Sequence, residues 1–234
     1  MTFVDVSSSS GFSPAMNADI PAGGIAVADF DNNGWPDIFV TGYSLPNRLF
    51  FNLGNGSFSE NATINQQLAG VLCSVAAAAD FDNDGRIDLY VGCRGDANHL
   101  FRNLGGAGFA DVTPPALQHD PANLQGQRTD AVAWGDIDGN GLPDLFIGIY
   151  PDQSQPDLSD PDNLDRLVLN LGQGEWLDVG AGLPADPRGR AALAAAVKRI
   201  APDREITETS SLAETEEALE SRSAELVCLD LHME

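Results

Sequence analysis

The sequence has few basic residues, few cysteines and no long apolar run. Of its 234 residues, only 12 are Lys or Arg against 35 Asp or Glu, which gives a formal net charge of -23. A field of that sign repels phosphate backbones and anionic lipid headgroups, so we expect neither nucleic acid nor a membrane surface as a partner. No apolar stretch approaches the length of a membrane span.

Several functional signatures are also missing. The opening stretch MTFVDVSSSSGF lacks the basic start and apolar run of a signal peptide, which leaves open a cytoplasmic location or a start further upstream. Cys73, Cys93 and Cys228 are too few and too scattered for a disulfide framework or a zinc site. Because a nucleophile elbow, a phosphate loop and a dinucleotide fingerprint are all lacking, we expect no enzymatic activity.

What the sequence does contain is an acidic loop in three copies. Aligned on their first aspartates, the copies read DFDNNGWPD from Asp29, DFDNDGRID from Asp80 and DIDGNGLPD from Asp136. Asp stands at positions one, three and nine, Asn or Asp at position five, and Gly at position six. Carboxylates this close repel one another in water, so the pattern favours a bound cation. Three copies in one register also indicate a repeat architecture.

Short apolar runs flank each loop and predict strands. GIAVADF, SVAAAADF and DAVAWGDI precede the loops, and DIFVTGY, DLYVGCR and DLFIGIY follow them. A third run (NRLFFNLG, NHLFRNLG, DRLVLNLG) and a fourth (GSFSENA, AGFADVT, GEWLDVG) complete each unit. Four strands per unit, recurring about every fifty residues, predict a mainly β fold built of three propeller blades or a similar closed β array.

The composition changes after about Leu183. RGRAALAAAVKRI and SLAETEEALESR are typical of helices, and ELVCLDLH of a strand. Alternating helix and strand indicates an α/β unit and not another blade. We therefore expect a repeat region over 1–184, with loops at 29–37, 80–88 and 136–144, followed by a short α/β segment over 185–234.

The loop chemistry favours calcium. This ion takes six to eight oxygen ligands and tolerates irregular geometry, whereas magnesium demands an octahedron and zinc prefers His or Cys. The glycine at position six permits a turn that a side chain would obstruct. An EF-hand is excluded, because it needs a Glu at position twelve. Three hairpin turns with solvated acids are the alternative, but they do not account for the shared register.

We thus expect about three calcium ions. The predicted ligands are the side chains at positions one, three, five and nine and the main-chain carbonyl at position seven: Asp29, Asp31, Asn33, Trp35 and Asp37; Asp80, Asp82, Asp84, Arg86 and Asp88; Asp136, Asp138, Asn140, Leu142 and Asp144. With four acids, the second loop is expected to bind calcium most tightly, although the positive charge of Arg86 reduces its advantage in affinity over the other two loops.

The units resemble FG-GAP/VCBS repeats, the calcium-loop blades of integrin α-subunit propellers and of many bacterial secreted proteins. VADFDNNGWPDIFVTG and NRLFFNLGNGSF are especially similar to repeats of the ASPIC/UnbV-associated type. The resemblance covers residues 1–184 and implies an extracellular or periplasmic location. It also implies that a complete propeller has more units than the three found here, so we expect further propeller blades or self-association.

The last fifty or so residues resemble the middle of a response-regulator receiver domain. Asp230 in LVCLDLHM matches the phospho-accepting aspartate of that family. The acidic pair that holds magnesium in such domains is not visible, and neither are the later hydroxyl and lysine residues. A phosphoryl-transfer site without these groups should not work, so the segment is expected to be inert.

Together these features predict a calcium-binding repeat module that binds a protein or glycan ligand, with calcium in a structural role. The alternatives are a signalling protein whose sensory repeats are joined to an incomplete receiver, and a non-catalytic repeat region of a larger enzyme. Cys73 and Cys93 lie on strands that pair across the second loop; a disulfide is conceivable, but two small core residues are expected. Four aromatic residues are expected to pack between blades: Trp134, Trp176, Phe50 and Phe101.

Overall fold

The computed structural model describes residues 4, 6, 9–12, 23–42, 45–69, 73–94, 97–118, 129–149 and 165–179. The chain divides into two units, Met1–Ala181 and Gly182–Glu234, and every described residue lies in the first. The α/β segment expected over 185–234, Asp230 included, therefore lies outside the described residues. Within the described part of the chain, no helix is long and apolar enough to cross a membrane.

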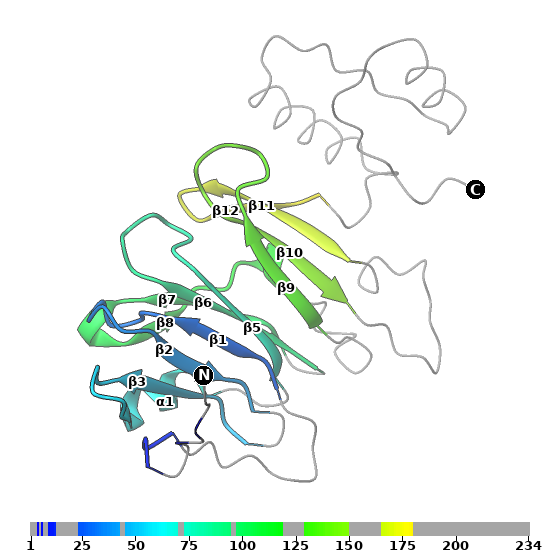
Figure 1. Cartoon of the computed structure of the whole chain (residues 1–234). Helices are drawn as coiled ribbons and strands as arrows, with labels where there is room; N and C mark the ends of the chain where they lie inside the picture. Colours follow the sequence, from blue (N-terminus) through cyan, green and yellow to red (C-terminus); the bar gives the residue numbers. More distant parts are fainter. Residues whose placement is uncertain are drawn as a thin grey trace, which may run out of the picture. The chain divides into compact units, whose positions relative to one another are not determined.

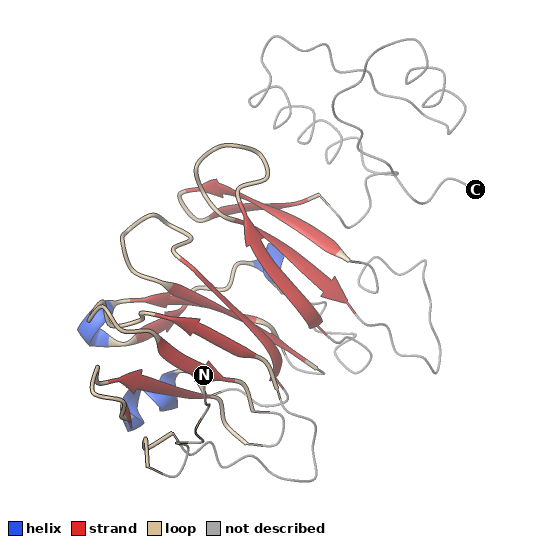
Figure 2. Cartoon of the chain, in the orientation of Figure 1, coloured by secondary structure: helices blue, strands red, loops and turns tan. Residues whose placement is uncertain are grey.

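The described strands form three antiparallel sheets of four strands each (Figure 1, Figure 2). Blade one contains β1 (Ile25–Ala28), β2 (Asp37–Val40), β3 (Arg48–Asn52) and β4 (Phe58–Glu60). Blade two contains β5 (Cys73–Ala79), β6 (Asp88–Cys93), β7 (His99–Asn103) and β8 (Phe109–Asp111). Blade three contains β9 (Thr129–Gly135), β10 (Asp144–Ile149), β11 (Arg166–Gly172) and β12 (Glu175–Asp178). In each sheet the spatial order follows the chain, which confirms the mainly β fold of three four-stranded blades.

The helical segments described are short connections. They are α1 (Ala62–Gln67) and the 3-10 turns η1 (Gly105–Ala107) and η2 (Pro115–Leu117). Asn61 caps α1, because its side-chain oxygen accepts hydrogen bonds from the amides of Thr63 and Ile64. Asn65 Oδ1 in turn accepts a hydrogen bond of 2.7 Å from the Leu49 amide, which fixes α1 against β3.

Blade two lies between the other two blades and contributes to two cores. All six residues of its strand β6 are buried. Side chains alternate along a strand, so Leu89 and Val91 pack into a cluster shared with blade one, whereas Tyr90 packs into a cluster shared with blade three. The first strands of the blades also lie side by side, with β5 between β1 and β9 (Figure 1). A blade with two apolar faces needs a neighbour on each side.

Three of the four aromatic residues expected between blades are found there. Trp134 and Trp176 lie 6.4 Å apart between ring centroids, and Trp134 contacts Tyr90 of blade two at the same distance. Phe101 packs into the cluster between blades one and two. Phe50 contacts the N-terminal segment and not a second described blade: its ring lies 4.9 Å from that of Phe12, on the face of blade one that points away from blade two.

Phe12 covers part of the outer face of blade one. Its ring lies 5.8 Å from that of Phe58, and the Phe58 amide donates to the Ser10 carbonyl at 2.6 Å. Phe58 pairs across the strands with Asn52, as Phe109 pairs with Asn103 in blade two. The ring of Phe109 lies 6.1 Å from that of a loop phenylalanine of the preceding blade, Phe30. Phe12 thus takes on blade one the place that a preceding blade takes on blade two.

The other end of the array is open among the described residues. Position two of the loop is 3% exposed in blade one (Phe30) and 7% exposed in blade two (Phe81), because the following blade covers it. In blade three the same position, Ile137, is 55% exposed. Phe146, which points away from the cluster shared with blade two, is 39% exposed. Blade three therefore has an exposed apolar face on the side that points away from blade two.

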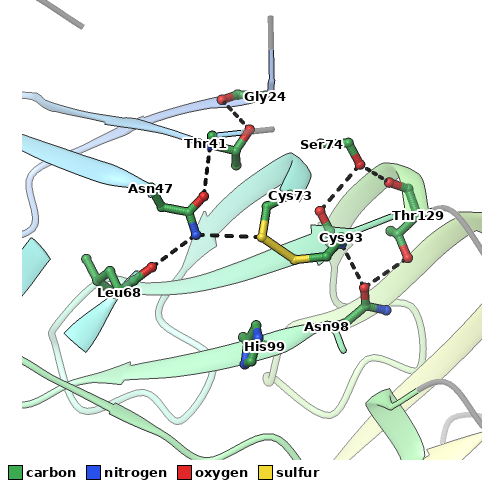
Figure 3. The surroundings of a disulfide bond; sticks show 12 residues. Gly24, Thr41, Asn47, Leu68, Cys73, Ser74, Cys93, Asn98, His99 and Thr129 are labelled. Carbon is green, nitrogen blue, oxygen red and sulfur yellow. Dashed lines mark hydrogen bonds between the residues drawn. A yellow bond between two sulfur atoms is a disulfide. The ribbon is translucent and has the colours of Figure 1, made fainter. Parts of the chain in front are cut away.

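Cys73 and Cys93 form a disulfide (Figure 3). The expectation of two small reduced core residues was wrong, because these residues are direct cross-strand partners in the β5–β6 register and their side chains face each other. Polar residues surround the bond: Asn47 Nδ2 lies 3.7 Å from Cys73 Sγ, and the Cys93 amide donates to Asn98 Oδ1 at 2.9 Å. Ser74 next to the bond donates to the carbonyl of Thr129 at 2.5 Å, which joins blade two to blade three.

Thiol counting tests this disulfide. The chain has three cysteines, so denatured, unreduced protein should show one reactive thiol per chain, and reduced protein should show three. Removing the bond with the Cys73→Ser/Cys93→Ser pair should lower the free energy of unfolding by about 2–4 kcal/mol, because the unfolded chain gains freedom. Three thiols in unreduced protein would contradict the assignment.

Candidate metal centre

The loop between the first and second strands of each blade brings three carboxylates together. One oxygen of each carboxylate lies within 4.8 Å of one oxygen of each of the other two in three clusters: Asp29, Asp31 and Asp37; Asp80, Asp82 and Asp88; Asp136, Asp138 and Asp144. These are loop positions one, three and nine, as the sequence pattern predicts. The fourth acid of the second loop, Asp84, is not a member of its cluster.

The aspartate at position nine links the loop to the third strand. Asp37, Asp88 and Asp144 begin β2, β6 and β10, and all three are fully buried. In blade two, Asp88 Oδ2 accepts from the Phe81 amide at 3.1 Å, and Oδ1 accepts from the Asn103 amide at 2.8 Å. The same pair of bonds recurs in the other blades, with donors Phe30 and Asn52 to Asp37 and Ile137 and Asn170 to Asp144.

The aspartate at position one holds the turn of the loop. Asp29 accepts from the amides of Asn33 at 3.0 Å and Gly34 at 2.7 Å, and Asp80 accepts from those of Asp84 and Gly85 at 3.0 and 2.8 Å. Asp136 accepts from the Gly141 amide at 3.0 Å. Because these backbone donors point inward, they partly offset the repulsion between the carboxylates.

Positions four and six both have left-handed backbone conformations. At position six, Gly34, Gly85 and Gly141 have φ values of 88°, 83° and 86°. Glycine is required there as expected, and the physical reason is the positive φ and not space, because a Cβ there would meet nothing within 4 Å. Position four was not recognised from the sequence. It holds Asn32, Asn83 and Gly139, residue types that tolerate this conformation, with φ values of 58°, 55° and 71°.

Burial and like charges disfavour ionisation of the position-nine acids. Burial, with a contribution from the other acids of its loop, raises the pKa of Asp88 to about 7, although hydrogen bonds from two backbone amides lower it. Burial likewise raises the pKa values of Asp37 and Asp144. A cation among these oxygens would favour the ionised form of each acid.

The side chain at position five stabilises the loop in the same way in all three copies, whether it is Asn or Asp. The Oδ1 atoms of Asn33, Asp84 and Asn140 accept from the amide at position seven, at 2.8, 3.0 and 2.7 Å. That donor belongs to Trp35, Arg86 or Leu142, whose carbonyls remain predicted ligands. In the described structure, the side chain at position five thus holds the backbone at position seven, whose carbonyl is the predicted ligand.

Asparagines at the end of the third strand join neighbouring blades. Asn103 Nδ2 donates to the Phe30 carbonyl of blade one at 2.7 Å, and Asn170 Nδ2 donates to the Phe81 carbonyl of blade two at 2.8 Å. Each also donates to its own blade, as Asn52 does to the Pro36 carbonyl at 3.0 Å. Sequence reasoning missed this joint, although the Asn that precedes Leu-Gly in all three units was the available signal.

The donor set in each cluster fits a hard cation. Each cluster consists of carboxylates, and no His or Cys belongs to it. Three carboxylates whose oxygens converge within 4.8 Å can hold a metal ion. The three clusters occupy the same place in three blades, so all three loops offer a bound ion the same ligand positions.

This combination of four-stranded blades and acidic loops is found in a known class of repeat protein. The family model of the FG-GAP-like repeat matches residues 29–91 and 80–147, which together cover all three loops and the first part of β10. The chain belongs to this family.

Curated relatives extend the comparison. Cartilage acidic protein 1 of Xenopus tropicalis is 32% identical over 162 residues, which is 66% of this chain and 24% of that protein. Cartilage acidic protein 1 of Mus musculus and of Homo sapiens are 29% and 28% identical over 165 residues. The chain spans about a quarter of the length of these relatives.

The inter-blade asparagine can be tested against a matched control. Asn170→Ala removes the Nδ2 donations to Phe81 of blade two and to Pro143 of its own blade, whereas Asn52→Ala removes a donation to Pro36 within blade one. Both variants also lose the bond that the side-chain oxygen accepts from the amide two residues on, Gly172 or Gly54, so this loss cancels in the comparison. We expect Asn170→Ala to lower the free energy of unfolding by about 1–3 kcal/mol more than Asn52→Ala, because it leaves a buried carbonyl unsatisfied. Urea unfolding followed by circular dichroism measures the difference; equal losses would show that the joint adds nothing.

Proposed function

We propose that the chain is a calcium-binding, propeller-type repeat module in which calcium has a structural role. The observation that carries this proposal is the recurrence of one three-carboxylate cluster at the same loop in all three blades. A chance group of acids would not repeat with the same backbone donors at positions one and nine. Family membership and the hard-oxygen donor set support the choice of calcium.

The proposed role of the metal follows from the loop contacts. Asp29, Asp31 and Asp37 would hold an ion in blade one, and their counterparts would do so in the other blades. The ion would supply positive charge where like charges converge. Because the position-nine acid is also bonded to the end of the third strand, ion binding would stabilise the first three strands of a blade together.

We also propose that the module binds a protein or glycan partner and has no catalysis of its own. The edge of the blades that carries the loops exposes large apolar side chains, Trp35, Leu53 and Leu104. Exposed apolar side chains on one edge, rimmed by polar residues, are a common feature of binding surfaces. The disulfide supports an oxidising compartment, which is extracellular or periplasmic.

Calcium titration tests the metal assignment. Three sites with dissociation constants of ~10⁻⁴ to 10⁻³ M are expected, the range of extracellular modules, and magnesium should bind more weakly. Calcium at about 100 times its dissociation constant should stabilise the fold by roughly 2.7 kcal/mol for each filled site, and a chelator should reverse this. Calorimetry at near-physiological salt and melting curves with and without chelator provide the measurements.

Two variants separate the loop from general charge effects. Asp31→Ala should abolish one site and leave the others nearly intact. Asp130→Ala removes the same charge from a residue that pairs with Arg94 outside the loops, and it should change neither stoichiometry nor affinity. Fewer than two sites in the native chain, or a melting temperature that calcium does not change, would rule out the proposed role.

The open face of blade three supports a further proposal, that the module associates with further blades or with itself. Ile137 and Phe146 are exposed on this end of the array, and repeat arrays need a cap or a partner over such surfaces. The isolated chain should therefore self-associate, and the Ile137→Asp/Phe146→Ser variant should reduce that association. Light scattering over a concentration series measures it. A native chain that stays monomeric at every concentration would refute self-association.

A further inference from the structure

The three loops differ in which side chains contact two acceptors. These acceptors are the carboxylate at position three and the main-chain carbonyl of the asparagine near the end of the third strand. In blade one, Asn33 Nδ2 donates to Asp31 Oδ2 at 3.1 Å and to the Asn52 carbonyl at 2.9 Å. In blade three, the amide of Asn140 makes the same two bonds, to Asp138 Oδ2 at 3.2 Å and to the Asn170 carbonyl at 2.8 Å. One neutral side chain at position five thus serves both acceptors.

Blade two meets the same two acceptors with arginines. Position five is Asp84, whose carboxylate has no N–H to donate. Arg86 Nε donates instead to the Asn103 carbonyl at 2.8 Å, and Arg102 Nε lies 2.7 Å from Asp82 Oδ2. Both guanidinium groups also pair with Asp84, Arg102 at 3.1 Å. Two charged side chains therefore replace one amide.

Neither arginine has a charged counterpart in the other blades. The position of Arg102, directly before the last asparagine of the third strand, is Phe51 in blade one and Leu169 in blade three. Together with Arg86 and Arg102, the second loop has four carboxylates and two guanidinium groups, a formal charge of -4 + 2 = -2. The first and third loops each have three carboxylates and a charge of -3.

Arg102 lies directly on a candidate metal ligand. Asp82 belongs to the second three-carboxylate cluster, and its Oδ2 is the atom that Arg102 approaches. The other oxygen, Asp82 Oδ1, is shielded from water and has no hydrogen-bond partner in the described structure. Arg102 Nε likewise forms no hydrogen bond there, so the contact is one of charge and not of directed bonding. An incoming cation can replace such a contact.

We propose that Arg102 is an internal competitor for the cation of the second loop, so that this loop is the last of the three to fill. The inference rests on the proposed calcium function. It reverses the order that counting acids suggests: the extra acid, Asp84, is held by Arg86 and Arg102, and a calcium ion must displace Arg102 from Asp82 before it binds. Among the described residues, no Arg or Lys pairs with an acid of the first or third cluster.

Isolating the second loop tests the inference. In the full chain, Asp31→Ala and Asp138→Ala together remove an acid from each of the other clusters. On this background, Arg102→Leu, which introduces the residue type of blade three, should raise the calcium association constant roughly ten-fold, because a paired positive charge leaves the site. Arg102→Lys should give an intermediate value. Calorimetric titration with calcium chloride measures the association constant of the background chain and of both Arg102 variants.

The matched control is Arg94→Leu, which removes an arginine that pairs with Asp130 outside the loops. It should leave the association constant of the second loop within about two-fold. Circular dichroism checks that each variant is folded, and Arg102→Gln replaces Arg102→Leu if the leucine variant is not. An association constant that none of the Arg102 variants raises above the control would overturn the inference.

The outcome also separates this inference from the function on which it rests. If the native chain binds calcium at the first and third loops but Arg102→Leu has no effect, only the role of Arg102 fails. If the native chain and all variants bind no calcium, the proposed function fails as well. In the native chain, Asp82→Ala should remove the weakest of the measured sites, and loss of the tightest site would also contradict the proposal.

Discussion

The buried aspartate at loop position nine is the interaction on which each blade depends. Asp88 and its counterparts are removed from water, a state that is unfavourable for a carboxylate unless donors replace the lost solvent. Each obtains these donors from two other elements of its blade, the start of the loop and the end of the third strand. The conformation of the loop, the position of the third strand and the convergence of the acids are therefore coupled through one side chain.

Much of this arrangement follows from the sequence because it repeats. Three loops in one register, each flanked by short apolar runs, were enough to predict four-stranded blades and the nine acids that converge. Contacts that depend on register between distant strands could not be predicted in this way. The approach of Arg102 to Asp82 requires the pairing of β7 with β6, and the Cys73–Cys93 bond requires a particular alignment of β5 with β6.

The second blade shows how a repeat tolerates local change. Replacing the position-five amide by Asp84 removes two N–H donors and adds a negative charge, yet the loop keeps the same backbone, with Gly85 at a φ of 83° beside 88° and 86° in the other loops. Arg86 restores the donor to the Asn103 carbonyl, Arg102 makes an ion pair with Asp82, and their two positive charges outweigh the one negative charge that Asp84 adds. Structural equivalence of the loops therefore does not imply equal electrostatics.

The asparagine joints also make the array directional. In each joint, the earlier blade offers a carbonyl and a loop side chain, and the later blade offers an asparagine amide and an aromatic ring. Two identical ends cannot satisfy each other through this contact. A unit that continues the array past Ile137 must present the later-blade half, as blade two presents Asn103 and Phe109 to blade one, and so only one orientation of an added unit completes the joint.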